Sequence, residues 1–141
     1  MAILFGLVAG CNQSLPTTVP VRGKVTWQGK PLTTGTVTFE PINSDGASLL
    51  RPARGCLNGD GTYRLSSFRT NDGAQPGQYA VVITSYTNSP SIDAMGPPPK
   101  WAIPASYGRA DTSGLSATIS ADATGEVEIN FDLPLKGTAA R

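Results

Sequence analysis

The sequence predicts an all-β fold, a β-sandwich of about seven short antiparallel strands. Three observations indicate it. Apolar and polar residues alternate with a period of two, no stretch keeps the apolar spacing of a helix, and turn signals recur at intervals of about ten residues. With 16 Gly and 12 Pro among 141 residues, the chain is too broken by turns for a helical protein. At 39% hydrophobic residues it is too apolar for a disordered one.

The alternation places the strands along the chain. In the last expected strand, four apolar residues from Val127 to Leu133 alternate with four polar residues from Glu126 to Asp132. The acidic residues of that strand, which include Glu128, are interpreted as a solvated strand face and not as a catalytic pair, because paired catalytic acids come from separate elements. The expected strands lie at residues 19–28, 35–41, 54–57, 62–67, 78–86, 114–120 and 125–133.

Turn residues separate these strands. QGKP at 28–31 predicts a tight turn after the first strand, and NGDG at 58–61 carries two dipeptides that favour hairpin turns. The segments NDG at 71–73 and PG at 76–77 turn the chain into its central strand. NGDG has a single acid, far short of the six to eight oxygens that Ca²⁺ takes, so we interpret it as a hairpin turn.

Composition excludes several functional classes. The net charge of +1, with Lys and Arg scattered, argues against a nucleic-acid binder. The chain has no histidine, so it can form neither a Ser-His-Asp nor a Cys-His arrangement and has no imidazole metal ligand. Two cysteines cannot complete a zinc site. The sequence therefore predicts a protein that is not an enzyme, with no catalytic residue, no metal and no cofactor.

The N-terminal segment predicts secretion and lipid attachment. Residues 2–10 are uncharged and mostly apolar, about half the length that a membrane-spanning helix needs. VAGC at 8–11 resembles the bacterial lipobox, which implies that Cys11 is lipidated and that residues 1–10 are a signal peptide that is removed. Residues 11–18 then form a tether. The alternative is a buried N-terminal strand with Cys11 in the core, since no basic segment precedes the apolar residues.

Whether the two cysteines can form a disulfide depends on whether Cys11 is lipidated. A lipidated Cys11 leaves Cys56 unpaired, whereas an unmodified Cys11 allows a Cys11–Cys56 disulfide in an oxidising compartment. No motif surrounds Cys56, and we expect it to be a small buried hydrophobic residue.

The strand and turn pattern resembles a known group of domains. VRGKVTWQGKPLTTGTVTFEP, LNGDGTYRLSS and DGAQPGQYAVVIT are similar to the opening strands, the central hairpin and the following strand of transthyretin-like, carboxypeptidase regulatory-like β-sandwiches, which have an Ig-like Greek-key topology. The matching positions are Gly23, Val25, Gly29, Pro31, Leu32, Gly35, Val37, Phe39, Asp60, Gly61, Tyr63, Leu65, Gly77, Tyr79, Val81 and Ile83.

The C-terminal part narrows this resemblance. Ile103, Pro104 and Tyr107 in IPASY, the SGL at 113–115 and the FDL at 131–133 resemble the small lipid-anchored members found in planctomycete bacteria. The resemblance covers residues 19–133, which we expect to be the sandwich domain, followed by a flexible tail at 134–141. It implies a fold and says little about activity.

One segment does not fit the strand pattern. Residues 87–104 contain five prolines, and a loop of this length inside a small domain is often functional. Its triproline presents Met95, Trp101 and Tyr107 as a possible binding surface for a protein or a glycan. The alternative is that Trp101 folds back and covers the open end of the sandwich.

Taken together, the sequence predicts a non-catalytic, lipid-anchored module of a bacterial cell envelope that faces the periplasm or the exterior. Its expected partners are the membrane, through the lipid, and an envelope protein or glycan. A transthyretin-like binder of a small ligand or carbohydrate, using the loop around Trp101, is the alternative. An envelope hydrolase is the least favoured hypothesis.

Overall fold

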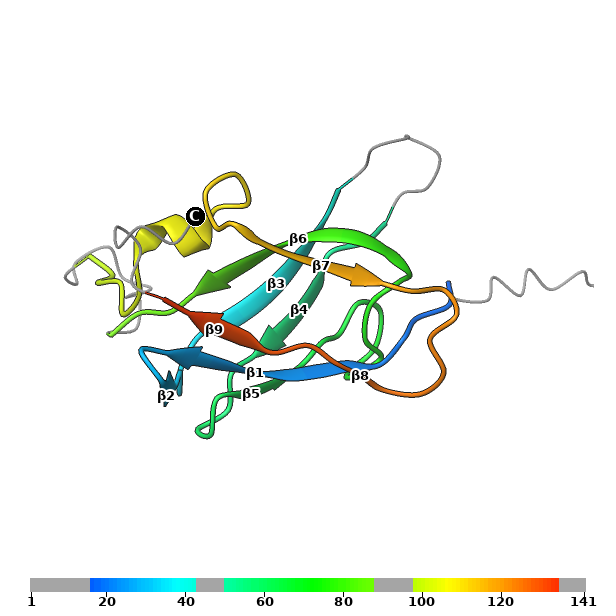
Figure 1. Cartoon of the computed structure of the whole chain (residues 1–141), viewed down its shortest axis with the longest axis horizontal. Coiled ribbons are helices and arrows are strands. Elements are labelled where there is room, and N and C mark those ends of the chain that lie inside the picture. The colour runs from blue at the N-terminus through cyan, green and yellow to red at the C-terminus, as the bar shows by residue number, and fades with distance from the viewer. Residues whose placement is uncertain (1–15, 43–49, 88–97, 135–141) are drawn as a thin grey trace, which may run out of the picture.

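The computed structural model describes residues 16–42, 50–87 and 98–134, which fold into two β-sheets packed face to face (Figure 1). This confirms the predicted all-β class. Each of the seven expected strand segments overlaps at least one observed strand. The elements in chain order are β1 (Val21–Trp27), β2 (Lys30–Pro31), β3 (Thr36–Pro41), β4 (Ala53–Cys56), β5 (Thr62–Arg64), β6 (Gly77–Thr84), the 3₁₀ turn η1 (Ala105–Gly108), β7 (Leu115–Ile119), β8 (Val127–Glu128) and β9 (Phe131–Leu133).

The two sheets differ in strand direction. The four-stranded sheet has the order β4-β3-β6-β7, and all its pairs are antiparallel. The other sheet is built around β1, which pairs antiparallel with β2 and β5 and parallel with β8 and β9. The parallel pairs depart from the antiparallel arrangement that we expected. Side chains alternate with a period of two in both kinds of sheet, so the sequence pattern does not distinguish them.

The core lies between the sheets and joins them through aromatic rings. Phe39 of β3 is 5.8 Å from Tyr79 of β6 and 6.2 Å from Phe131 of β9, measured between ring centroids. Tyr63 of β5 stacks on Phe131 at 6.4 Å. The four rings come from four strands of both sheets, and all four are buried. Aromatic side chains bury more area than aliphatic ones, so this cluster supplies much of the hydrophobic stabilisation.

The first hairpin follows from its turn residues. Trp27 pairs with Lys30, which leaves Gln28 and Gly29 as a two-residue loop. Both loop residues have positive φ, 52° and 77°, as a type I′ turn requires. The turn predicted at 28–31 is therefore present, and it adds the short strand β2 that the alternation did not indicate.

Gly23 in the middle of β1 makes room for a buried tyrosine. Its missing side chain would point into the core, where a Cβ atom would lie 1.7 Å from the carbonyl oxygen of Ile129 and 2.8 Å from the ring of Tyr63. The Tyr63 hydroxyl donates a hydrogen bond of 2.6 Å to that same carbonyl. Burial raises the pKa of Tyr63 above its usual range, so the hydroxyl stays a donor.

The same contact divides the last strand. In a regular parallel ladder the Ile129 carbonyl would accept from the Lys24 N–H, but here it accepts from Tyr63. The side-chain oxygen of Asn130 accepts from the Lys24 N–H instead, at 2.9 Å. The register is unchanged on either side, since Arg22 pairs with Glu128 and Val25 with Phe131. The single strand expected at 125–133 is therefore observed as β8 and β9.

A carboxylate organises the loop that leads from β5 to β6. Asp72 accepts hydrogen bonds from the backbone N–H groups of Ser67, Phe68 and Arg69, at 2.7, 3.0 and 2.9 Å. Burial acts to raise the pKa of Asp72, but these hydrogen bonds outweigh it and hold the pKa below its usual value. Asn71 beside it has a φ of 60°, a conformation that Asn tolerates better than most residues.

Gly23→Ala tests the close packing at β1. We expect the free energy of unfolding to fall by about 3 kcal/mol, because the new methyl group meets backbone that cannot move without disturbing three strands. Urea denaturation measures the change. The control is Gly59→Ala, where a Cβ would meet no atom within 4 Å and φ is not positive. Equal midpoints for the two variants would contradict the assignment.

Candidate functional site

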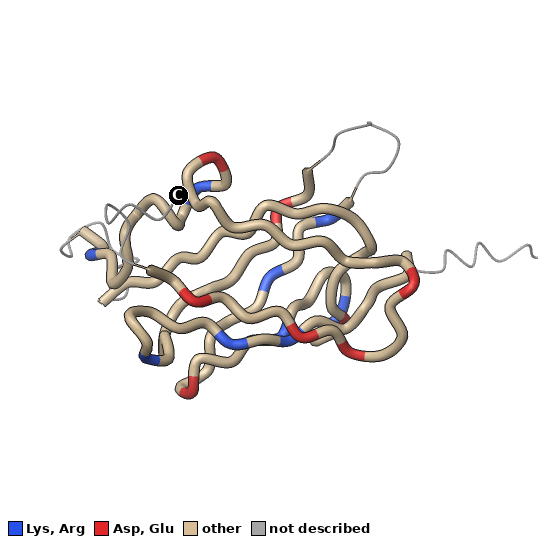
Figure 2. Tube along the Cα trace, viewed as in Figure 1, with Lys and Arg blue, Asp and Glu red and all other residues tan. Residues whose placement is uncertain are grey.

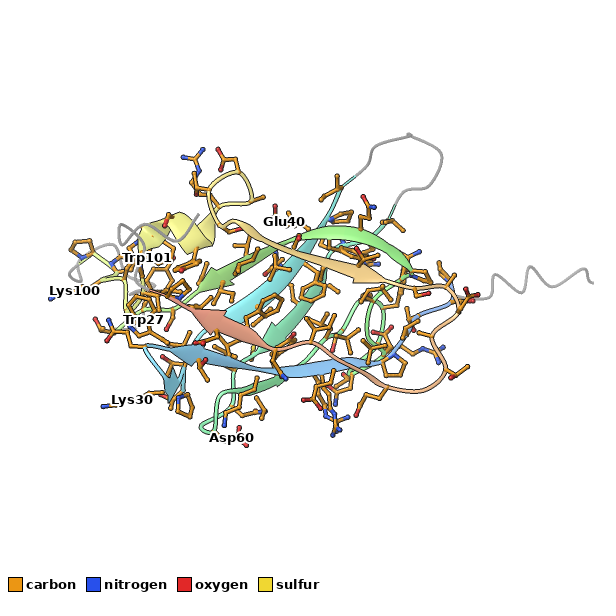
Figure 3. The ribbon with its side chains drawn as sticks, in the orientation of Figure 1. Trp27, Lys30, Glu40, Asp60, Lys100 and Trp101 are labelled. Carbon is orange, nitrogen blue, oxygen red and sulfur yellow. The ribbon has the colours of Figure 1, made fainter. Side chains whose placement is uncertain are left out.

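Two tryptophans gather at one end of the sandwich, and we call this region the aromatic end. It comprises Trp27, Tyr86 and Trp101, together with Lys30 and Lys100. The labelled members lie at the left of Figure 3, beside η1 and the β1–β2 hairpin. The three aromatic side chains are half-buried, and both lysines are exposed. Aromatic surface and positive charge therefore occur together at this end of the sandwich.

Trp101 is held by an extension of β6. Residues Tyr86 and Trp101 form an antiparallel bridge, and their rings lie 4.7 Å apart between centroids. The bridge is completed by hydrogen bonds from the Thr87 N–H to the Lys100 carbonyl, at 2.8 Å, and from the Ala102 N–H to the Ser85 carbonyl, at 2.9 Å. The segment around Trp101 is thus paired with the strand that precedes the loop.

The indole of Trp101 also rests on η1. A Cβ atom at Gly108 would lie 2.4 Å from the indole, so any residue other than glycine would collide with the ring. Trp101 packs against the hydrophobic core and is only partly exposed. The structure therefore has Trp101 folded back over the end of the sandwich, as the second of our two sequence-based alternatives expected.

The other residues of the expected binding loop are placed differently. Tyr107 is 1% exposed, and its hydroxyl donates to the Pro134 carbonyl at 2.7 Å. Its ring belongs to the core and does not face the surface, so it offers nothing to a ligand. Burial raises its pKa. Met95 lies outside the described residues. Of the triproline, Pro98 and Pro99 are described and exposed.

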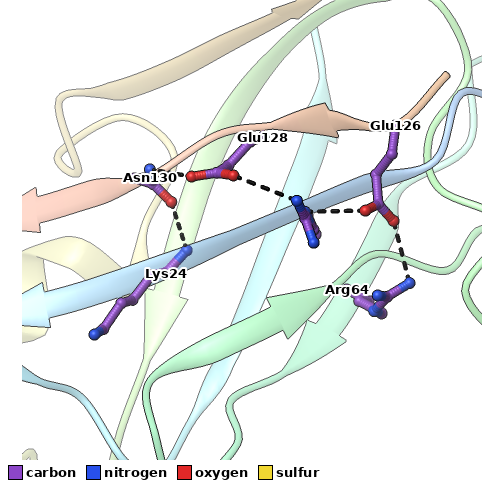
Figure 4. A network of polar contacts seen from close by, with 6 residues as sticks. Lys24, Arg64, Glu126, Glu128 and Asn130 are labelled. Carbon is purple, nitrogen blue, oxygen red and sulfur yellow. Dashed lines mark hydrogen bonds and ion pairs between the residues drawn. The ribbon is translucent and has the colours of Figure 1, made fainter.

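A second polar region covers the outer face of β1, β5 and β8, and we call it the charged face. Arg22 pairs with Glu126 at 2.9 Å and with Glu128 at 3.7 Å, while Arg64 pairs with Glu126 at 3.1 Å. Asn130 donates to Glu128 at 3.0 Å and accepts from the Lys24 backbone (Figure 4). Figure 2 shows basic residues along β1 and acidic residues along the neighbouring chain segment that contains β8.

The alternation of apolar and polar residues in the sequence predicted that the side chains of the charged face point outward, but it did not predict their contacts. The parallel pairing of β1 with β8 sets Arg22 beside Glu128, although 106 residues separate them in the chain. Exposed ion pairs contribute roughly 0.2–1 kcal/mol each, so the network adds modestly to stability. Both carboxylates are engaged by cations, in agreement with our interpretation of them as a strand face.

The charged face contains an open hollow of about 420 Å³. Its size suits a small polar molecule, and its walls offer hydrogen-bond donors and acceptors from three strands. Among the described residues the Lys24 ammonium is in no ion pair. An incoming anion would have to compete with Glu126 and Glu128 for the arginines, so the charge balance favours a weakly charged ligand. The walls are formed by Arg22, Gly23, Lys24, Asn58, Thr62, Tyr63, Arg64, Glu128 and Asn130.

Cys56 is exposed, and our expectation of a buried residue was wrong. β4 alternates, with Ala53 and Gly55 facing inward and Arg54 and Cys56 facing outward. The inward position of residue 55 requires a glycine, because a Cβ there would lie 2.3 Å from the Arg64 carbonyl. Cys11, the possible disulfide partner, lies outside the described residues.

The turn at 58–61 has the expected hairpin form. The Gly61 N–H donates to the Asn58 carbonyl at 2.9 Å, and the Asn58 N–H donates to the Thr62 carbonyl at 2.8 Å. The Asp60 carboxylate accepts from the Thr62 hydroxyl and from the Thr62 N–H. The hydroxyl bond is the main cause that lowers the pKa of Asp60. This acid is therefore used to close the turn.

The described residues contain neither a metal-binding cluster nor a membrane-spanning helix. Residues 16–42, 50–87 and 98–134 contain no group of three Cys, Asp or Glu side chains placed to hold a metal ion. Within the same residues, no helix has the length and apolar character needed to cross a membrane. Comparison of the chain with family models, with curated proteins and with solved structures finds no match.

Gly108→Ala tests the packing of Trp101. In a Trp27→Phe background, Trp101 is the only tryptophan, because the chain has two. We expect the methyl group to push the indole toward solvent, with a red shift of its emission and a loss of about 1 kcal/mol of stability. Gly59→Ala in the same background is the control. An emission maximum that does not move would show that the indole does not rest on η1.

Proposed function

We propose that the protein is a non-catalytic, lipid-anchored module of a bacterial cell envelope that has a structural or binding role. In this proposal Cys11 carries the lipid, residues 11–18 are the tether, and the sandwich faces the periplasm or the exterior. The observation that carries it is the placement of the aromatic end relative to the N-terminal end of β1.

These two regions lie at opposite ends of the molecule. The chain joins the sandwich at Val19, which exchanges backbone hydrogen bonds of 2.8 and 3.0 Å with Ala74. β1 then runs the length of the sheet to Trp27 at the aromatic end (Figures 1 and 3). A strand of this length spans roughly 20 Å. A tether that precedes Val19 would therefore hold the aromatic end away from the membrane, where a partner can reach it.

We also infer that the sandwich is of the transthyretin-like, carboxypeptidase regulatory-like type. In support of this, residues that carry the resemblance occupy constrained places. Gly23 leaves space for Tyr63, and Gly61 has a φ of 83° against the Val25 carbonyl. Gly35 has a φ of 135° beside the Thr84 carbonyl. Glycine is favoured at such positions for steric reasons. The glycines shared with these domains are therefore ones that the backbone conformation requires.

Mass spectrometry of the protein purified from its native membranes tests the anchor. We expect a mature chain that begins at Cys11 and carries acyl chains, and we expect Cys11→Ala to move the protein into the soluble fraction. Cys56→Ala is the control and should stay in the membrane fraction. An intact Met1 terminus in the soluble fraction would rule out the anchor.

A second candidate function is the binding of a carbohydrate or other small ligand at the aromatic end. The paired rings of Tyr86 and Trp101 favour it, because a half-exposed aromatic surface beside lysines suits a sugar or a polar ring. In this alternative Trp101 is the contact residue. Tyr107 is excluded by its burial.

Tryptophan fluorescence tests this alternative with a panel of glycans and small molecules. In Trp27→Phe, which keeps Trp101, we expect a saturable change in emission on addition of a true ligand. Trp101→Phe, which keeps Trp27, should respond less or not at all. Titrations that leave the Trp101 signal constant across the whole panel would count against the binder and leave the anchor unaffected.

A further inference from the structure

An open hollow of about 580 Å³ lies on the outer surface beside β4 and β5, where the two sheets meet. Arg54 of β4 and Ser66, which follows β5, exchange backbone hydrogen bonds of 3.0 and 2.8 Å and so join the sheets along this edge (Figure 1). Gly55 has no side chain, which lets the β4 backbone approach the Arg64 carbonyl. Two arginines from different sheets, Arg54 and Arg64, therefore line one hollow, which we call the arginine hollow.

The arginine hollow differs in charge from the hollow of the charged face. None of the described residues in its walls is acidic. The Arg54 guanidinium forms no ion pair with any described residue, and Arg64 binds Glu126 through Nη1 at 3.1 Å. The positive charge of these walls is therefore neutralised only in part, and the carboxylate that does so lies outside them.

Neutral side chains add hydrogen-bonding groups to the walls. The Ser66 hydroxyl oxygen accepts from the Asn71 N–H at 2.7 Å, and its own proton is donated to no described residue. The side-chain amide of Asn71 and the hydroxyl of Thr36 also bond to no described residue. Hydroxyl and amide groups both donate and accept hydrogen bonds, so they suit the hydroxyls of a sugar.

We propose that the arginine hollow binds a sugar-sized molecule that carries an oxyanion, namely a phosphate, sulfate or carboxylate group. Arg54 is the main anchor, because a guanidinium can donate two parallel hydrogen bonds to such a group. The volume of the hollow lies in the range of small-molecule sites and exceeds what a lone anion needs. The inference depends neither on the lipid anchor nor on binding at the aromatic end, whose residues are not in these walls.

Calorimetric titration of the full chain at low salt tests the ligand class. The probes are glucose 6-phosphate, glucose 6-sulfate and glucuronate, with glucose and inorganic phosphate as controls. We expect saturable binding of at least one charged sugar, and the probe that binds most tightly identifies the anion. Failure of all three charged sugars to bind overturns the proposal. Glucose that binds as tightly overturns the role of the anion, and inorganic phosphate that does so overturns the role of the sugar.

Arg54→Gln tests the anchor. We expect it to raise the dissociation constant at least about tenfold, because it removes a charged hydrogen-bond donor. The matched control is Arg109→Gln, which removes the same charge from an exposed arginine that pairs with Asp111 at 3.2 Å and lies outside the walls. It should change the dissociation constant less than twofold. Equal effects of the two substitutions would show that the anion is not held by Arg54.

Cys56 provides a second measurement that leaves Arg54 unchanged, so it holds even if the Arg54 variant fails to fold. Its exposed thiol lies in the walls of the hollow, and in a Cys11→Ser chain it is the only thiol. We expect the tightest charged sugar, at ten times its dissociation constant, to slow alkylation by uncharged iodoacetamide at least about threefold, since about nine-tenths of the sites are then occupied. An unchanged rate would place the bound molecule elsewhere and overturn the assignment.

Discussion

The hydrogen bond from Tyr63 to the Ile129 carbonyl, which passes under Gly23, holds together the sheet that contains the first and the last described strands, β1 and β9. It joins β5 to the last strands across the centre of β1. Two further features follow from it. Asn130 has to supply an acceptor to Lys24, and that side chain in turn orients Glu128 in the charged face. A buried hydroxyl thus determines the polar pattern on the opposite surface of the sheet, because a buried donor without an acceptor costs about 1–3 kcal/mol.

The sequence was sufficient to predict a β-sandwich, the inward face of its strands and its turns. It was not sufficient to predict which strands pair with one another. Alternation at Val21 and Val25 identified the inward face of β1, and the turn residues Gln28 and Gly29 marked its end. Neither could indicate that β8 and β9 pair with β1 in parallel, since pairing partners far apart in the chain leave no local pattern. The break at Ile129 was invisible for the same reason: it depends on a tyrosine 66 residues away.

In the candidate site, too, the sequence predicted some features and missed others. Trp101 was identified from its place in a proline-rich segment, and its packing on Gly108 matches one of the two alternatives. Tyr107 looked similar in sequence, but a core aromatic and a surface aromatic are distinguished only by what surrounds them. The prediction for Cys56 failed because Gly55, which has no side chain to show its direction, was not read as the inward residue of β4. The charged face required the register of β1 and β8, which only the structure supplies.

The way in which the chain joins the sandwich has a mechanical consequence. A pull on the residues before Val19 is transmitted along β1, which is bonded to strands on both of its sides. Because the strands lie along the direction of the pull, the load is shared by many backbone hydrogen bonds in shear, instead of opening them one after another. The Val19–Ala74 bridge meets the load first, and Val19 and Ala74 both belong to the buried core, so opening this bridge also exposes the N-terminal end of that core. The fold is thus arranged to bear tension at its N-terminal end while the opposite end keeps its shape.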